Sequence, residues 1–388
     1  MHKNYKKANK SSINEGNYVT IYDKVIDFLI YQWYAVPAAF ATRWVKKIKK
    51  LPLDRKKWLD ERARRISQES VPVKRNNIKK RRKSNKTRVL KAPEIFSLYE
   101  NPDHTIRYFD SVINEATKHE FDATIFFDLQ ETKIIKIDAI MYLLAIIQNL
   151  KYKTVFRLTF AGNQPRDSEA NSVFKESGFL KYVNSVDKAL YKTSDKVQIA
   201  TGKDVDALIS RVICDFAIEK LGNDYSKRKI LHPALIELMT NTRQHAYDSS
   251  KHTRMTHQWY IYTESTSDKV NFTFLDTGFG IPQTVRRNFL EIITQRMPIF
   301  QNNDARLIYS ALLGEFRTET KKRNRGRGLP YILENACNNQ LQNLSIISGN
   351  GMCTFGGGNE PELRSIEHQF MGTLFSWSFR KDNLEVPQ

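Results

Sequence analysis

Apolar side chains recur at helical spacing through residues 231–248, LHPALIELMTNTRQHAYD. Glu237, Asn241 and His245 follow one another at intervals of four, so on a helix they form one polar ridge. Pro233 is expected in the first turn of this helix, where its missing N–H costs no hydrogen bond. A solvated surface helix and the wall of a site for a metal–phosphate complex both fit the ridge. The face expected to pack against a core carries Leu231, Leu235, Leu238, Thr242 and Ala246.

Ahead of this helix, short apolar runs alternate with longer helical patterns. Residues 123–129 and 154–160 are rich in strand-forming residues and have the length of buried strands. Helices are expected at residues 103–119, 137–150 and 167–178. Strands that alternate with helices predict a small α/β unit within residues 92–200.

A second mixed pattern begins near residue 201. The pattern over residues 201–222 predicts an amphipathic helix, capped by Thr201 or by Lys203 and Asp204. Residues 349–369 are expected to form a loop. After the polar ridge, strands are expected at 258–263 and 269–275, a helix at 329–339, and a last strand from Gly372 onward.

Charge is distributed unevenly along the 388 residues. The net charge is +20, and residues 1–91 hold 26 Lys and Arg against seven Asp and Glu. Within this arm, residues 73–91 contain ten basic residues and no acidic one. Such a run fits a solvated linker, and it also fits sequence-independent contact with the phosphate backbone of a nucleic acid.

The cysteines and the hydropathy of the chain indicate in which cellular compartment the protein is expected. The three cysteines have neither metal-ligand spacing nor a disulfide framework, which favours a reducing cytoplasm. The first residues lack the pattern of a signal peptide. The longest uncharged stretch, residues 28–42, has 15 residues with Pro37 inside, whereas a membrane span needs about 20. We therefore expect no transmembrane span, and either a helical hairpin or contact with a membrane surface for this stretch.

Four short motifs follow one another in the second half. The helix carries ExxxNxxxHA over residues 237–246, DTGFGI follows a strand at 276–281, RGRGLP precedes a helix at 325–330, and Gly-Thr at 372–373 begins a strand. Each motif alone is weak. In this order they resemble the GHKL superfamily of ATPases, which includes gyrase B, the ninety-kilodalton heat-shock chaperone, sensor histidine kinases and MutL. Pro330 replaces a third glycine that the family often has, as in its anti-sigma-kinase-like branch.

The resemblance implies a role for each matching residue. Asn241 would hold a Mg²⁺ ion that bridges the phosphates of ATP, because its amide oxygen is a hard ligand. Glu237 would act as general base for the attacking water or assist phosphoryl transfer. Asp276 would accept a hydrogen bond from the adenine amino group, with Thr373 beside it, and His245 would help to order the site. The remaining residues expected at the nucleotide are Gly278, Gly280, Ile281, Arg325, Gly326, Arg327, Gly328 and Leu329.

The same resemblance makes residues 282–325 the ATP lid. A basic clamp over the triphosphate, a surface for an acidic partner and a mobile soluble loop all fit its composition. Its basic residues are Arg317, Lys321, Lys322, Arg323 and Arg325.

The earlier α/β unit has a resemblance of its own. FFDLQETKIIKIDAIMYLLAIIQ, residues 126–148, resembles the STAS domain of bacterial anti-sigma-factor antagonists. In that family an Asp-Ser pair precedes a helix, and a partner kinase phosphorylates the serine. Here Asp138 is followed by Ala139, so the resemblance implies that the usual phosphoswitch is absent.

Together these patterns predict an α/β (α+β) protein in three parts. Residues 1–91 would be a basic, partly helical arm, residues 92–200 a STAS-like domain, and residues 201–388 a Bergerat-type two-layer α/β sandwich that binds ATP and Mg²⁺.

Three functions stay open at this point. The first is a regulatory ATPase that switches its lid and the surface for an unidentified protein partner. The second is a serine or histidine protein kinase of the anti-sigma or sensor type, although His119-Glu120 is the only pair suited to a phosphoacceptor histidine. The third is an ATP-regulated protein that binds nucleic acid through residues 73–91. Many members of the resembled family dimerise, so a homodimer also stays open.

Overall fold

The computed structural model describes residues 86–118, 123–153, 158–184, 192–245, 257–287, 303–316, 328–338, 341–356 and 360–381. All of them belong to one compact unit that runs from Lys83 to Gln388. The expectations for residues 1–85, including the apolar stretch at 28–42, lie outside the described residues. The same holds for His119 and Glu120.

The first part of the unit is built around a parallel sheet. Its three strands lie in the order β1–β3–β5, with β1 and β5 both parallel to β3. A separate two-stranded parallel sheet joins β2 and β4. The elements are β1 (Lys86–Lys91), β2 (Ile95–Phe96), α4 (Pro102–Lys118), β3 (Ala123–Asp128), β4 (Ile134–Ile135), α5 (Ile137–Lys153), β5 (Leu158–Gly162), α6 (Ser168–Glu176) and α7 (Phe179–Asn184).

Most of the elements expected here are confirmed, with one correction in the basic run. Residues 86–91 were included in the linker or nucleic-acid contact at 73–91, but they form β1 and pair with the whole of β3. β1 lies at the edge of its sheet, where Val89 is 55% exposed and Leu90 is partly buried. The high proportion of basic residues masks this strand in the sequence. Asp167 caps α6 by accepting hydrogen bonds from two backbone N–H groups.

The second part is built around a five-stranded antiparallel sheet. Its strand order is β6–β7–β8–β10–β9, and β6 extends across the expected domain boundary at residue 201 to pair with β7. The elements are β6 (Lys196–Gly202), α8 (Ala207–Lys220), α9 (Ser226–His245), β7 (Trp259–Ser265), β8 (Lys269–Asp276), α11 (Asp304–Leu312), α12 (Gly328–Cys337), β9 (Gln342–Thr354) and β10 (Glu362–Arg380).

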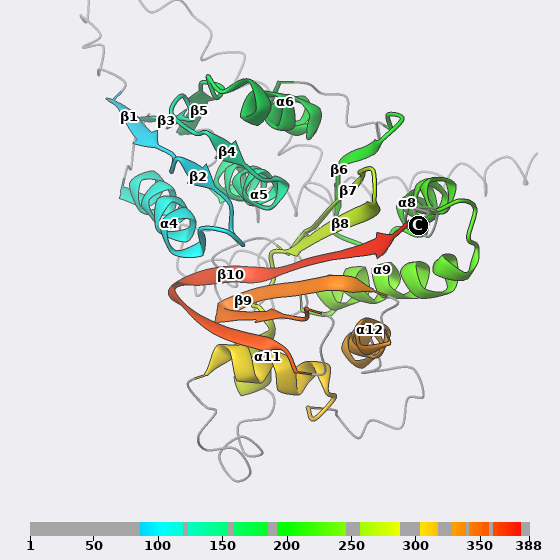
Figure 1. Cartoon of the computed structure of the whole chain (residues 1–388). Coiled ribbons are helices and arrows are strands. Elements are labelled where there is room, and N and C mark those ends of the chain that lie inside the picture. The colour runs from blue at the N-terminus through cyan, green and yellow to red at the C-terminus, as the bar shows by residue number, and fades with distance from the viewer. Residues whose placement is uncertain are drawn as a thin grey trace, which may run out of the picture. The chain divides into compact units, whose positions relative to one another are not determined.

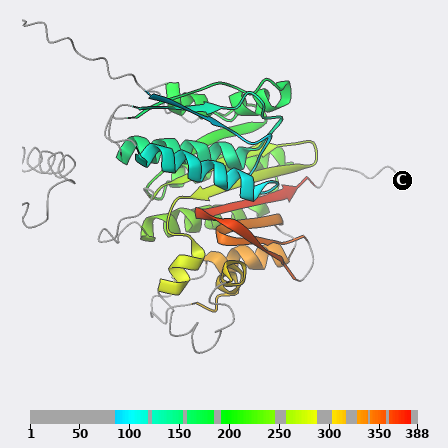
Figure 2. The same cartoon turned by 90° about the vertical axis from the view of Figure 1, so that its left-hand side faces the viewer.

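Helices cover both faces of this sheet (Figures 1 and 2). On one face, α8, α9 and α12 enclose a core that contains Phe216, Leu235 and Phe274. On the other face, α4 and α5 pack against the sheet, so Tyr142 and Phe370 belong to one continuous core. The chain is therefore a mixed α/β protein with parallel and antiparallel sheets, which agrees with the expected α+β class.

Three local predictions are wrong. α8 begins at Ala207, and its N-cap is Asp206, whose side chain accepts hydrogen bonds from the N–H groups of Leu208 and Ile209. The caps expected at Thr201 or at Lys203-Asp204 are therefore wrong. The range 349–369 was expected to be a loop, but residues 349–354 belong to β9 and residues 362–369 to β10, which consequently begins ahead of Gly372. The third is the position of Pro233, which lies inside α9 and not in its first turn.

The described helices also bear on membrane insertion. None of them is both long enough and apolar enough to cross a bilayer.

Candidate functional site

A buried carboxylate lies at the end of the central strand of the antiparallel sheet. Asp276 is the last residue of β8, and it is in register with Trp259 of β7 and Thr373 of β10. The N–H of Gly278 donates a 2.6 Å hydrogen bond to its Oδ1. Burial raises the pKa of Asp276 to about 7, although the hydrogen bond from Gly278 and the proximity of Thr242 act in the opposite direction. The expected pairing of Thr373 with Asp276 is thus present in the sheet register.

Two glycines allow the backbone to close around this carboxylate. Gly280 has φ +82°, and a Cβ there would lie 2.7 Å from Ser348 Oγ. Gly372 has φ +109°, and a Cβ there would lie 2.0 Å from the backbone oxygen of Asp276. Both positions therefore require glycine, for conformation and for space.

Ser348 of β9 joins the glycine turn to the neighbouring strands. Its Oγ accepts a 2.9 Å hydrogen bond from the N–H of Ile281 and donates a 2.7 Å bond to the oxygen of Gly372. The same oxygen lies 3.1 Å from Thr373 Oγ1. The motifs did not predict this residue, because a serine in a predicted strand resembles any other strand serine.

The C-terminal half of α9 meets the carboxylate directly. Thr242 is fully buried; its hydroxyl donates a 3.1 Å hydrogen bond to the carbonyl of Leu238, and its proximity to Asp276 lowers the pKa of that carboxyl. Asn241, the adjacent residue on α9, and Glu237, one turn earlier, are partly exposed. The predicted packing face of α9 is confirmed for Leu231, Leu235, Leu238 and Thr242, which are all buried, whereas Ala246 lies outside the described residues. His245 ends the helix, and its side chain is likewise outside them.

α9 begins earlier than its pattern predicted. The helix starts at Ser226, which places Pro233 in its interior and corrects the expectation of a first-turn proline. An interior proline leaves the carbonyl four residues earlier, here Lys229, without its N–H donor. The hydroxyl of Tyr331 on α12 donates a 2.8 Å hydrogen bond to that carbonyl. The helix therefore continues through Pro233 with a partner supplied by α12.

The glycine-rich motif before α12 is described only in part. Arg325, Gly326 and Arg327 lie outside the described residues, and Gly328 is the first residue of the helix. Leu329 is partly buried and, like Ile281, packs on the core beneath α9 and on the smaller cluster around Leu307. The predicted helix at residues 329–339 is confirmed as α12.

The expected lid contains ordered structure near both of its ends. Residues 281–287 are helical, and α11 lies within the range that was expected to be a lid loop. Asp304 is buried, pairs with Arg286 and accepts a 2.6 Å hydrogen bond from the N–H of Asn350 on β9. Arg317, Lys321, Lys322, Arg323 and Arg325 lie outside the described residues.

Next to the Asp276 turn lies a small aromatic group. The rings of His257 and Phe279 have centroids 5.4 Å apart, and the guanidinium of Arg287 lies 5.4 Å from the centroid of Phe279. Burial lowers the pKa of His257. The Nδ1 atom of this histidine is buried and has no hydrogen-bond partner among the described residues.

The Asp-Ala pair of the first part is closed to solvent. Asp138 is buried and accepts hydrogen bonds from the N–H of Leu98, at 2.9 Å, and from Ser97 Oγ, at 3.2 Å. Burial raises its pKa to about 6. Ala139 and Ser97 are both fully buried, so neither position presents a group to a kinase.

Comparison with known proteins assigns no family to this sequence: no protein-family model and no curated protein matches it. Among the described residues, no cluster of three or more His, Cys, Asp or Glu side chains could hold a metal ion. A Mg²⁺ ion held by one amide oxygen together with phosphate oxygens and waters would not need such a cluster.

Proposed function

We propose that the second part of the chain is an ATP-binding domain of the GHKL type, a Bergerat two-layer sandwich, which hydrolyses ATP to control a partner surface. One observation carries the proposal. Thr242, in the C-terminal half of α9, is close enough to Asp276 to lower the pKa of that carboxyl, so the residue next to Asn241 faces the end of β8. Two motifs separated by 30 residues in sequence therefore belong to one place in the fold.

The chemistry at Asp276 suits the amino group of adenine. A carboxylate this deeply buried is costly unless hydrogen-bond donors surround it, and its raised pKa reflects that cost. An amino group from a bound base would supply a further donor to the ionised form. The glycines at 280 and 372 let the turn pack directly on Ser348 and on the end of β8, which fixes the position of the carboxylate that would receive the base.

The polar ridge of α9 suits the phosphate end of the nucleotide. Asn241 would hold Mg²⁺, and that ion would neutralise charge on the phosphate oxygens when bound. Glu237 lies one turn earlier and is partly exposed, which suits a group that positions water. Gly328 opens α12, and the N-terminus of a helix is suited to an anion.

The experiment that tests this proposal is ATP binding measured with and without Mg²⁺. Asn241→Ala is expected to weaken ATP–Mg²⁺ binding at least about tenfold, since a lost ligand to a charged group costs about 1.5–3 kcal/mol. Asn114→Ala, an exposed asparagine on α4, is the matched control and should leave binding unchanged. If the Asn241→Ala variant binds ATP–Mg²⁺ as tightly as the parent, Asn241 is not a ligand of the metal and the site assignment is wrong.

One assay with γ-labelled ATP distinguishes ATP hydrolysis from transfer of the phosphate to a protein. Free labelled phosphate supports the ATPase. Label retained on this protein or on an added candidate substrate supports the kinase alternative. Because Ala139 replaces the serine of the STAS resemblance and is fully buried, we expect no label on the first part of the chain.

A second function, nucleic-acid binding, is favoured by the concentration of charge in residues 1–91. The proposed contact is residues 73–91, of which 73–85 lie ahead of β1 and hold seven Lys and Arg. Replacing these seven by Gln in the full chain should weaken binding to a DNA duplex and flatten its dependence on salt. Seven matched Lys→Gln changes elsewhere on the surface are the control, and an unchanged salt slope in the first variant would exclude this contact.

A further inference from the structure

A cleft of about 450 Å³ lies between α8 and α9, the two neighbouring helices at the right of Figure 1. The cleft combines three basic side chains with an apolar floor and edge. It is lined by Ala207, Leu208, Arg211 and Cys214 of α8 and by Arg228 and His232 of α9.

The basic side chains have unused capacity for hydrogen bonds. Arg211 is exposed and makes no ion pair with any described residue. Arg228 pairs with Asp215, but its Nε is buried and lacks a partner in the described part of the chain. His232 uses Nδ1 in a 2.8 Å hydrogen bond with Ser210 Oγ, which leaves Nε2 for another partner.

The remaining lining is apolar and uncharged. Leu208 is 69% exposed, so its side chain is accessible to a ligand at the edge of the cleft. Cys214 is buried, and burial raises the pKa of its thiol to about 11, so it stays a neutral thiol at physiological pH. An anion would therefore meet cations at one side of the cleft and a neutral surface at the other.

The cleft is separate from the Asp276 site. Arg228 and His232 lie one turn apart on the same face of α9. At about 100° per residue, Glu237 is rotated by about 140° from His232 and about 180° from Arg228. The polar ridge and the cleft thus use opposite sides of α9, and a ligand in one does not require a ligand in the other.

We propose that the α8–α9 cleft binds a small organic anion, with its carboxylate or phosphate held by Arg211 and Arg228 and its apolar body against Ala207 and Leu208. The cleft volume lies within the range of about 300–1,000 Å³ that is typical of small-molecule sites. Arginine presents a planar fork that matches both carboxylate and phosphate groups. The proposal does not rest on ATP binding.

Phenyl phosphate and benzoate are suitable probes, titrated into the full chain by isothermal calorimetry or ligand-observed NMR. Binding with a Kd of about 1 mM or tighter is expected for at least one of them, and the stronger of the two identifies the preferred head group. Arg211→Gln should weaken that binding about tenfold, since a charge-assisted hydrogen bond is lost. Arg306→Gln, on α11, is the matched control and should bind like the parent.

Two further probes test the two sides of the cleft: benzyl alcohol lacks the anionic group, and inorganic phosphate lacks the apolar body. Benzyl alcohol should bind more weakly than phenyl phosphate, and Leu208→Gln should weaken phenyl phosphate without affecting inorganic phosphate. Asn241→Ala should retain the probe, since Asn241 lies on the opposite side of α9. Absence of binding by both anions at about 10 mM would overturn the proposal, as would equal binding of benzyl alcohol or an unchanged affinity in Arg211→Gln.

Discussion

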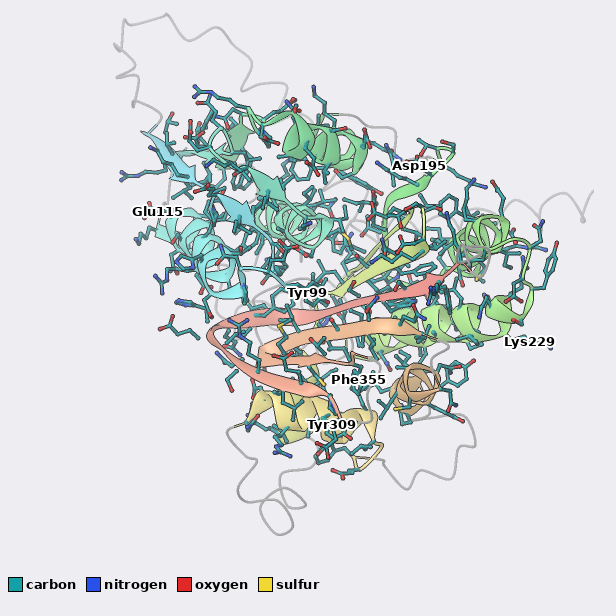
Figure 3. The ribbon with its side chains drawn as sticks, viewed as in Figure 1. Tyr99, Glu115, Asp195, Lys229, Tyr309 and Phe355 are labelled. Atoms are coloured by element: carbon teal, nitrogen blue, oxygen red, sulfur yellow. The ribbon has the colours of Figure 1, made fainter. Side chains whose placement is uncertain are left out.

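The hydroxyl of Tyr331 donates a hydrogen bond to the backbone carbonyl of Lys229, across 2.8 Å, and thereby connects α12 to α9. Figure 3 labels Lys229 on α9. Pro233, four residues later, has no N–H to offer that carbonyl. The tyrosine hydroxyl therefore replaces the backbone hydrogen bond that Pro233 cannot donate to the Lys229 carbonyl. It also fixes the helix that follows the RGRGLP motif against the helix that carries Asn241.

Tyr331→Phe is expected to destabilise the protein by about 1 kcal/mol, because the Lys229 carbonyl then depends on solvent for a donor. Chemical denaturation followed by circular dichroism measures the change. Tyr225→Phe is the matched control, since that ring is 67% exposed and its hydroxyl has no hydrogen-bond partner among the described residues. In a Pro233→Ala background the alanine supplies the missing N–H, so the cost of Tyr331→Phe should shrink. An equal cost in both backgrounds would contradict the role assigned to the tyrosine.

The titration of Asp276 is expected to make stability fall as pH rises from about 4 to about 7. Its pKa is raised from 3.8 in the unfolded chain to about 7 in the folded protein. Over this window the folded state keeps a proton that the unfolded state has released, so the free energy of unfolding decreases by at most about 1.4 kcal/mol per pH unit. Asp276→Asn removes this contribution and should flatten the profile.

Asp138 acts in the same direction below pH 6, since burial also raises its pKa. The difference between the Asp276→Asn variant and the parent therefore isolates Asp276, and Asp138→Asn provides the control. Parallel stability profiles for parent and Asp276→Asn between about pH 4 and pH 7 would show that the carboxylate is ionised throughout.

The fold was predictable wherever one periodicity dominated. α4, α5 and β3 were expected within one to three residues of their observed bounds, because their apolar faces are long and regular. The C-terminal end of β9 was not, since Gly349 and Gly351 resemble loop residues in sequence. A Cβ at Gly349 would lie 2.2 Å from Asp304 Oδ2, and one at Gly351 would lie 2.3 Å from the N of Ala305. These glycines are present because α11 packs closely on β9, a tertiary contact without a local signal.

In the candidate site, too, some residues could be predicted from the sequence and others could not. Asp276 and Thr373 were predicted from motifs, and the strand register places them side by side. The predicted site residues did not include Ser348 and Tyr331, because their roles depend on which strand or helix lies opposite. Thr242 was expected to pack on the core, yet it also lies close enough to Asp276 to lower the pKa of that carboxyl. Short motifs record the residues that would face a ligand, whereas the residues that position them are determined by tertiary packing.

Ser348→Ala is expected to cost about 2 kcal/mol or more, since the N–H of Ile281 loses its acceptor and the carbonyl of Gly372 loses its donor, both in a buried region. Thermal and chemical denaturation measure the loss. Ser345→Ala on the same strand is the control, because its side chain makes no hydrogen bond with the described residues. If ATP binds beside Asp276, Ser348→Ala should also weaken it, whereas Ser345→Ala should not. Equal stability of the two variants would contradict the role of Ser348 as the connection between turn and strands.

Arg286→Ala is expected to loosen the attachment of α11 to β9. Asp304 is 6% exposed, and without Arg286 its charge is balanced only by hydrogen bonds such as that from Asn350. The cost should be about 1–2 kcal/mol, less than for a fully buried pair because Arg286 is itself partly exposed. Hydrogen exchange at residues 304–312 should rise in this variant, with Arg287→Ala as the neighbouring control. Unchanged exchange there would show that hydrophobic packing alone holds α11.

Phe370→Ala is expected to destabilise both parts of the unit together. The side chain is buried between the antiparallel sheet and α5, where its ring centroid lies 4.5 Å from that of Tyr142. Removing a buried phenylalanine costs about 3–5 kcal/mol. Because one core spans both parts, unfolding should remain a single transition at a lower midpoint, whether followed by far-ultraviolet circular dichroism or by tryptophan fluorescence. Trp259 and Trp377 lie in the antiparallel sheet, and the other three tryptophans lie within residues 1–85. With Trp33, Trp44 and Trp58 replaced by Phe, two separated midpoints would mean that the parallel sheet and its helices unfold independently.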